Sequence, residues 1–252
     1  MIDLDIVVSV AILFAACLTR STFGFGEALV AMPLLSMVVG VKDAAATVAL
    51  TSIFNAVVIL LSTKWENIEW SAAGYMLAGA LLGIPIGVYV LVNVPESAVK
   101  LVLAALVISF ALYNLTRPKM AKLETNIPGL AFGFVAGILG GAYNTIGPPM
   151  VIFGTLRHWP PQRFRLTLQA VFFPASLVVA GFHSANNLWT PLVVKSFFVA
   201  IPFLMLAAVV GREINKRLEG SRFTRYIFYL LLVIGAVLVG TIVRDTLGSD
   251  GN

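Results

Sequence analysis

The sequence predicts an all-α, polytopic integral membrane protein with two inverted repeats, each a short or broken helical hairpin followed by three transmembrane helices. Composition, the lengths of the apolar segments and the distribution of basic residues predict this class. The 252 residues are 59% hydrophobic and 12% charged, whereas a soluble domain is about 45–50% apolar and about 25% charged. Such a surface suits lipid rather than water, which excludes disorder, nucleic-acid binding and an ordinary cytosolic enzyme.

The apolar segments divide the chain into two similar halves, residues 1–118 and 119–252. Helices of about twenty residues can cross a hydrocarbon core of about 30 Å, and each half has three such segments after a pair of shorter ones. In the first repeat we expect a hairpin over 4–41, with segments 4–19 and 27–41, and helices over 44–63, 70–92 and 97–116. In the second we expect a hairpin over 127–157, with segments 127–141 and 148–157, and helices over 163–183, 191–213 and 222–243.

The basic residues predict how these segments are oriented. If the loop 117–122 is cytoplasmic, twelve Lys and Arg residues fall on the cytoplasmic side and four fall outside, as the positive-inside rule requires. The twelve are Lys64, Arg117, Lys119, Lys122, Arg157, Arg163, Arg165, Arg212, Lys216, Arg217, Arg222 and Arg225. Both termini then lie on the extracytoplasmic side. The two halves enter the membrane from opposite sides, so the repeats are inverted.

Inverted repeats with broken segments are typical of secondary transporters, whose substrate site lies between the repeats. A glycine-rich turn joins the short segments of each hairpin, and we expect helices to begin at Gly26 or Glu27 and at Pro148. A helix N-terminus carries partial positive charge and free amide donors. The turns therefore predict a buried site for a small anion, with the candidate substrate-binding residues Arg20, Ser21, Thr22, Gly24, Gly26, Tyr143, Asn144, Thr145, Gly147 and Pro148.

Arg20 and Glu27 are the only charged residues expected within the membrane in the first hairpin. Ionisable residues inside a membrane are functional candidates, so Arg20 is a candidate anion ligand and Glu27 a candidate proton carrier. Two alternatives stay open. The pair could form a salt bridge that fixes the hairpin, or the turn could reach the interface and leave both side chains solvated.

Other residues are expected to serve packing. Glycines at every fourth position along one helix face are typical of close helix packing, and here they are Gly79, Gly83 and Gly87. Lone polar residues on the long segments are expected to form interhelical hydrogen bonds, with substrate contact as the alternative; they are Asn55, Gln169 and Ser176.

The sequence offers little for catalysis. It contains no metalloprotease, nucleophile-elbow or phosphate-loop motif, and Cys17 is its only cysteine, so we expect no catalytic residue, metal or cofactor. His158 and His183 lie near segment ends, where we expect them at the membrane interface. An intramembrane enzyme is therefore less favoured than a transporter, whereas a channel would share the same sequence features.

The two turns carry a family resemblance. It rests on residues 21–35, which read STFGFGEALVAMPLL, and on residues 133–149, which read GFVAGILGGAYNTIGPP. Both resemble the TauE/SafE family of sulfite and organosulfonate exporters, also called toluene-sulfonate uptake permeases, and the resemblance covers nearly the whole chain. Many members have three consecutive glycines in the first turn, where this chain has Gly24-Phe25-Gly26-Glu27.

The resemblance implies a multi-pass permease of a prokaryotic plasma (inner) membrane that transports, and often exports, small sulfur-containing anions such as sulfite or organosulfonates. Whether transport is coupled to protons through Glu27 stays open. The alternative is a transporter or channel for other small organic anions such as carboxylates. The expected partners are the small anionic substrate and the lipid bilayer, with no nucleic acid, and a homo-oligomer stays open.

Overall fold

The computed structural model describes residues 4–61, 67–116, 122–217 and 221–249, and within these ranges it contains ten α-helices and no strand. The helices are α1 (Leu4–Phe23), α2 (Glu27–Val38), α3 (Val41–Leu61), α4 (Trp70–Asn93), α5 (Glu96–Thr116), α6 (Gly129–Tyr143), α7 (Gly147–Leu156), α8 (Pro161–Ala185), α9 (Pro191–Arg217) and α10 (Ser221–Ser249). The predicted all-α class is confirmed, and each predicted segment corresponds to one helix.

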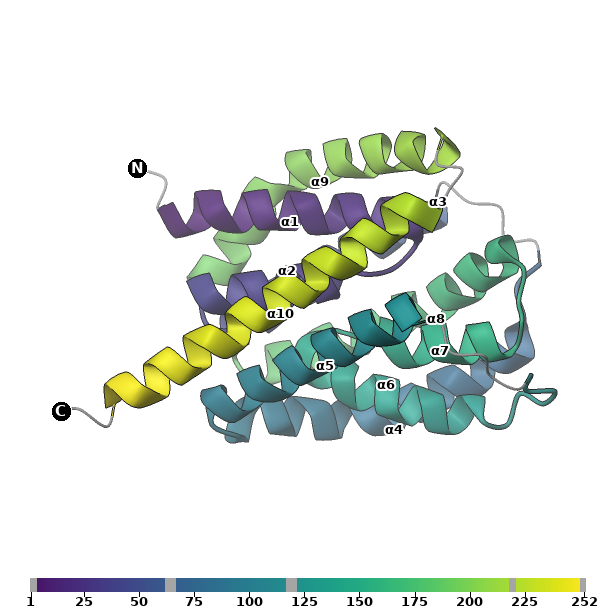
Figure 1. Cartoon of the computed structure of the whole chain (residues 1–252), viewed down its shortest axis with the longest axis horizontal. Helices are drawn as coiled ribbons and strands as arrows, with labels where there is room; N and C mark the ends of the chain where they lie inside the picture. The colour runs from purple at the N-terminus through teal and green to yellow at the C-terminus, as the bar shows by residue number, and fades with distance from the viewer. Residues whose placement is uncertain (1–3, 62–66, 117–121, 218–220, 250–252) are drawn as a thin grey trace.

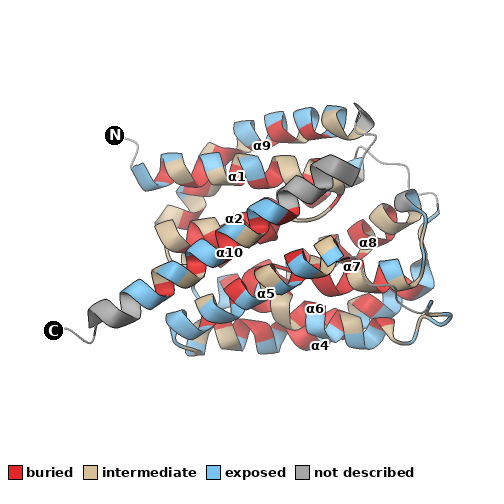
Figure 2. Cartoon of the chain, viewed as in Figure 1, coloured by how far each residue is buried: buried red, intermediate tan, exposed pale blue. Residues whose placement is uncertain are grey.

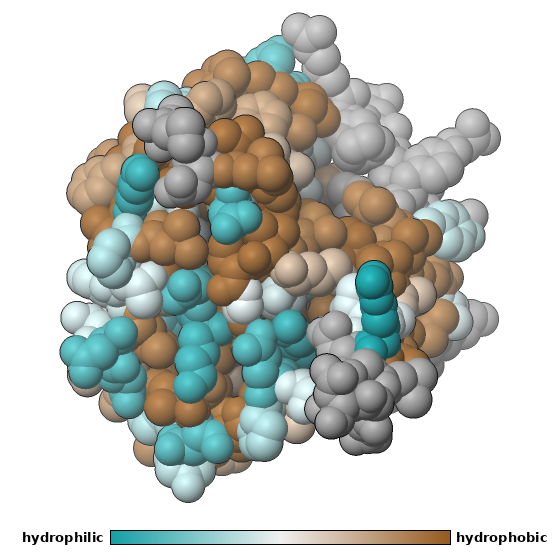
Figure 3. Space-filling view, turned by 90° about the vertical axis from the view of Figure 1, so that its left-hand side faces the viewer, coloured by the Kyte–Doolittle hydropathy of each residue, from teal (hydrophilic) through white to brown (hydrophobic). Residues whose placement is uncertain are grey.

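In the described part of the chain, six helices are long and apolar enough to cross a membrane: α1, α3, α4, α5, α8 and α9. Buried residues face the middle of the bundle, while the outer helix faces are exposed (Figure 2). Many of the exposed side chains are large and apolar, among them Leu82, Tyr89, Phe198, Val209 and Val233. Figure 3, which looks onto one end of the bundle, shows hydrophilic residues gathered among hydrophobic ones. This distribution is that of a multi-pass membrane protein, in which lipid surrounds the apolar flanks.

Helices far apart in sequence pack side by side. α1 lies along α9 and α6 lies along α4, while α3 contacts α8 and α5 contacts α10 (Figure 1). The N- and C-terminal ends of the chain lie at the same end of the bundle in Figure 1. Several features that predict the orientation fall outside the described residues, so the sidedness stays a prediction: the repeat boundary at 118–119, the basic residues Lys64, Arg117 and Lys119, and the side chains of Lys216, Arg217, Arg222 and Arg225.

The expected length of the first segment, 4–19, is wrong. α1 continues to Phe23 and is long enough to span. Arg20 does not end the helix because its charge is neutralised inside the protein by Glu27, 2.6 Å away. The Thr22 hydroxyl donates to the carbonyl of Leu18 one turn earlier, which satisfies the hydroxyl without leaving the helix. The first turn therefore begins only at residue 24.

Glycines bring α4 and α6 into backbone contact, which confirms the packing role predicted for Gly79, Gly83 and Gly87. A Cβ at Gly83 would overlap the carbonyl oxygen of Phe134, and one at Gly137 on α6 would overlap the carbonyl oxygen of Ala80. Small residues permit this approach between helices in a membrane. The short helix α6 is thereby held against the long helix α4, and the second turn at its end is held in place.

Candidate functional site

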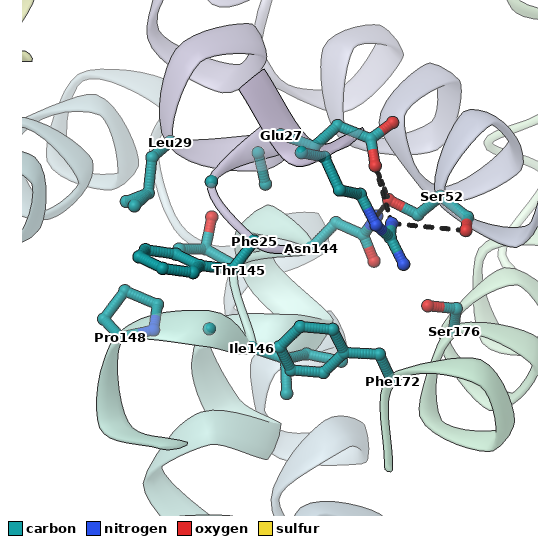
Figure 4. Close-up of a pocket in the computed structure, with 14 residues that line it drawn as sticks. Phe25, Glu27, Leu29, Ser52, Asn144, Thr145, Ile146, Pro148, Phe172 and Ser176 are labelled. Atoms are coloured by element: carbon teal, nitrogen blue, oxygen red, sulfur yellow. Dashed lines mark hydrogen bonds and ion pairs between the residues drawn. The ribbon is translucent and has the colours of Figure 1, made fainter. Parts of the chain in front are cut away.

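The two glycine-rich turns meet at one cavity, drawn in Figure 4. Its volume is about 40 Å³, and since one water needs roughly 10–15 Å³ on this measure, it has room for a few waters or a small oxyanion. Elements from both halves of the chain line it. The lining residues are Arg20, Phe25, Gly26, Glu27, Ala28, Leu29, Ser52, Asn144, Thr145, Ile146, Gly147, Pro148, Phe172 and Ser176.

The first turn directs the start of α2 at the cavity. Gly24 and Gly26 have φ of 87° and 97°, a left-handed conformation that glycine adopts without steric cost. α2 begins at Glu27, as expected, and no side chain caps it. The first four amides of a helix have no partner within it, and here they belong to residues 26–29, all of which line the cavity. The cavity wall therefore contains the start of α2 and the positive end of its dipole.

The second turn is built differently. α6 ends at Tyr143, and Asn144 caps it in a left-handed conformation, with its amide donating to the carbonyl of Gly140 at 2.7 Å. α7 begins at Gly147, one residue before the expected Pro148. Pro148 and Pro149 lack amide hydrogens, so this helix start offers fewer donors than α2 does. A Cβ on Gly147 would lie 3.9 Å from the Cβ of Phe25, so the two turns touch.

Arg20 and Glu27 form a buried salt bridge at the cavity wall. The distance from Arg20 Nη1 to Glu27 Oε2 is 2.6 Å, and the side chains are 5% and 3% exposed. This burial excludes the alternative in which both side chains are solvated at the interface. The guanidinium also lies 5.9 Å from the centre of the Phe172 ring, within range of a cation–π interaction. The salt bridge is present, and the roles of anion ligand and proton carrier stay predictions.

Neutral donors satisfy the Glu27 carboxylate from α3. Ser52 Oγ donates to Glu27 Oε2 at 3.1 Å, and Asn55 Nδ2 donates to Glu27 Oε1 at 2.8 Å. The second turn joins through Asn144, whose Nδ2 donates to Ser52 Oγ at 2.9 Å. A charge in a low-dielectric interior is tolerated when it is paired and hydrogen-bonded in this way. The carboxylate is thereby linked to both turns.

Arg20 extends the same network to α8. Its Nη2 donates to Gln169 Oε1 at 3.3 Å, and Gln169 Nε2 donates to the carbonyl of Gly24 at 2.8 Å. The interhelical hydrogen bonds expected of Asn55 and Gln169 are confirmed. Ser176, which had the same expectation, lines the cavity instead.

Two polar atoms of the cavity residues have no partner. Arg20 Nε and Asn144 Oδ1 are buried without a hydrogen bond. Leaving a buried polar atom unpaired costs about 1–3 kcal/mol, and such atoms are rare in proteins. Both belong to residues that face a space large enough for a ligand or water, which makes this cavity the best candidate site among the described residues.

Seven of the candidate substrate-binding and coupling residues line the cavity, and four do not. Ser21 and Thr22 lie in the last turn of α1 against Gly211 of α9. Gly24 lies in the first turn but not in the cavity lining, and its carbonyl accepts a hydrogen bond from Gln169 Nε2. Tyr143 is buried at the end of α6, and its hydroxyl donates to the carbonyl of Val99 at 2.9 Å.

Sequence reasoning missed several lining residues, of which Ser52 has the most hydrogen bonds. Ser52 and Asn55 stand three residues apart on α3, so they share one helix face. A polar pair with this spacing on an apolar segment was the signal available. Phe25 and Phe172 carry no comparable signal, because aromatic residues are common throughout this chain. His183 is fully buried within the protein, with Nε2 3.1 Å from the carbonyl oxygen of Gly141, and its expected depth at the membrane interface stays a prediction.

Comparisons with known proteins agree with the resemblance of the turns. Residues 9–238 match the family model described as sulfite exporter TauE/SafE. A probable sulfite/organosulfonate exporter TauE from Cupriavidus necator is 26% identical over 235 residues, which cover 91% of each chain. No solved structure matches the chain. The chain therefore belongs to the TauE/SafE family, a family of membrane anion transporters.

Proposed function

We propose that this member of the TauE/SafE family is a secondary transporter that exports small sulfur-containing anions, such as sulfite or organosulfonates, across a prokaryotic plasma membrane. Family membership and the spanning helices support a membrane anion transporter. The observation that carries the location of the site is the shared cavity. Residues of both turns line it together with Arg20, whose side chain is buried and has one unpaired nitrogen.

The anion would bind at the start of α2. Amides of residues 26–29 and the guanidinium of Arg20 are donors with positive character on one wall of the cavity,. Thr145 on the opposite turn offers a neutral hydroxyl, which in the structure donates to the carbonyl of Tyr143 at 3.0 Å. Oxyanions of sulfur have several acceptor oxygens and suit such a set of donors.

The helix contacts support two structural repeats, whose inverted orientation rests on the distribution of basic residues. If α1–α5 correspond to α6–α10, the contact of α1 with α9 corresponds to that of α6 with α4. Under the same exchange, the pair α3 and α8 becomes α8 and α3, and the pair α5 and α10 becomes α10 and α5. Each of these two contacts is therefore unchanged by the exchange. A two-fold relation between the repeats produces this pattern of exchange. Rocking of one repeat against the other around the cavity would expose the anion alternately to the two sides.

Glu27 would couple the anion to a proton. The Glu27 carboxylate pairs with Arg20 Nη1, so an incoming anion competes with it for the same guanidinium. Protonation of Glu27 removes this competition, so proton and anion binding favour each other. The charged and titratable groups near Glu27 are Arg20 and Cys17 of α1, while α3 presents neutral Ser52 and Asn55.

Transport in proteoliposomes tests this proposal. We expect saturable flux of sulfite down an imposed gradient, with small carboxylates as weaker competitors. Absence of saturable flux for any small anion contradicts a transporter, and stronger competition by carboxylates than by sulfite contradicts the substrate class.

The coupling role is tested with Glu27→Gln, using methanesulfonate as the probe because it stays ionised between pH 5 and pH 9. For the unaltered protein we expect the affinity for methanesulfonate to weaken as the pH rises, because proton and anion binding are linked. Glu27→Gln is a permanent mimic of the protonated state, so its affinity should be high and independent of pH. An unchanged pH profile in this variant contradicts proton coupling through Glu27.

A further inference from the structure

A second, smaller cavity lies beside the candidate site. Its volume is about 20 Å³, and α1, α2 and α10 contribute its lining, which is apolar apart from the hydroxyl-bearing Thr19 and includes Phe23, Val30 and Leu231. Three residues line both cavities: Phe25, Gly26 and Leu29. The cavity that contains the charge pair and the more apolar cavity therefore share this short piece of the first turn and the start of α2 as a common wall.

Phe25, Gly26 and Leu29 thus form a partition between the two cavities, and the Phe25 side chain is its largest part. In Figure 4 it lies toward Leu29 and Pro148, on the side of the cavity away from Glu27 and Ser52. Its ring contacts the Phe110 ring edge-on, with centroids 6.3 Å apart and planes at 84°. Phe110 in turn contacts the Phe228 ring, with centroids 6.1 Å apart. The ring is thus supported by α5 and α10 rather than held by the polar network.

The size of the polar cavity limits what can accompany an anionic head. An oxyanion that contacts Arg20 and the α2 amides occupies most of the 40 Å³. A carbon chain directed from the anion toward α2 and α10 would have to pass between the two cavities, where the apolar cavity begins. The Phe25 ring occupies that path.

We propose that Phe25 is the specificity-determining residue of the site, restricting it to oxyanions of about the size of sulfite or methanesulfonate and excluding longer alkyl and aryl sulfonates. This inference rests on the proposed anion site and names the substrate class within it. Removing the ring joins the two cavities and allows an alkyl tail to enter the apolar one. Each buried methylene then improves affinity about four-fold.

Binding of a homologous series tests the proposal. The purified protein is titrated with sulfite and with methane-, ethane-, propane- and butanesulfonate. For the unaltered protein we expect affinity to fall as the chain lengthens. For Phe25→Ala we expect the affinity for propanesulfonate relative to that for sulfite to rise by about ten-fold or more, as the methylene increment predicts.

Two further variants keep the result interpretable. Leu29→Ala opens the same partition and should shift the preferred chain length in the same direction by a smaller amount, so it replaces Phe25→Ala if that variant does not fold. Phe198→Ala removes an exposed ring on α9 and should leave the whole series unchanged. An unchanged chain-length profile in both Phe25→Ala and Leu29→Ala overturns the proposal, as does tight binding of propanesulfonate by the unaltered protein. Failure of the unaltered protein to bind any of these anions contradicts the proposed function instead.

Discussion

The two glycine-rich turns line one cavity but contribute different chemistry. The first turn follows a full-length helix, contains two left-handed glycines and is flanked by Arg20 and Glu27. The second follows a helix of 15 residues, is capped by Asn144 and leads into two prolines. All the charge and most of the free amides of the cavity come from the first turn. Two hairpins in corresponding positions thus need not share their chemistry, and here one provides the charged groups while the other provides a neutral wall.

The support behind each turn differs as well. The first turn is held by side-chain hydrogen bonds and the ion pair, which depend on protonation and on ligands. The second is held by backbone contact between α4 and α6, which depends on the absence of side chains at glycine positions. A bound ligand can replace the ion pair and hydrogen bonds that hold the first turn. No ligand can replace the close glycine packing that holds the second. This contrast predicts different consequences when each turn is altered.

The largest effect is expected from breaking the charge pair of the first turn. Arg20→Met leaves Glu27 buried without its cation, which costs about 3–5 kcal/mol, and it should also abolish anion binding. The double variant Arg20→Met/Glu27→Met should recover much of the lost stability, since apolar groups replace both charges, but it should not bind anions. Thermal unfolding in detergent and anion titration measure the two effects separately. A double variant as unstable as Arg20→Met would show that the pair is not the source of the loss.

A smaller effect is expected from crowding the support of the second turn. Gly137→Ala places a methyl group against the carbonyl of Ala80, and overpacking of this kind costs about 1–3 kcal/mol. The matched control is Gly74→Ala, because Gly74 lies on α4 with no atom within 4 Å of the added carbon. Unfolding midpoints of the two variants should differ clearly. Equal midpoints would mean that α4 and α6 separate easily and that the second turn is not held in this way.

The smallest effect is expected from cutting the link between the turns. Asn144→Gly keeps the left-handed backbone of this residue, where φ is 52°, and removes only the hydrogen bond to Ser52, worth about 0.5–1.5 kcal/mol. Asn144→Ala should cost about 1–2 kcal/mol more, because alanine is strained in that conformation. Unfolding of both variants measures the difference. If Asn144→Gly destabilises the protein as much as Arg20→Met does, the second turn is part of the charge network rather than a neutral wall.

Local features of the sequence predicted the helices and the turns. The lengths of the apolar runs predicted the helical segments. Gly26 and Pro148 marked the starts of α2 and α7 to within one residue, because glycine and proline act on the backbone at their own positions. The spacing of Gly79, Gly83 and Gly87 predicted a close helix contact for the same reason. The end of α1 was misjudged because an arginine in an apolar segment resembles a boundary until its partner is known.

Tertiary structure decided which of the candidate residues share the cavity. The sequence by itself determined a helical membrane protein with two helix starts suited to anions, since hydrophobic length and backbone preference are properties of short stretches. Only the packed chain brought Ser52, Gln169 and Phe172 to Arg20 and turned Tyr143 away, because residues far apart in sequence meet according to how whole helices cross. The partition at Phe25 arises in the same way, from the placement of α5 and α10 behind a single ring.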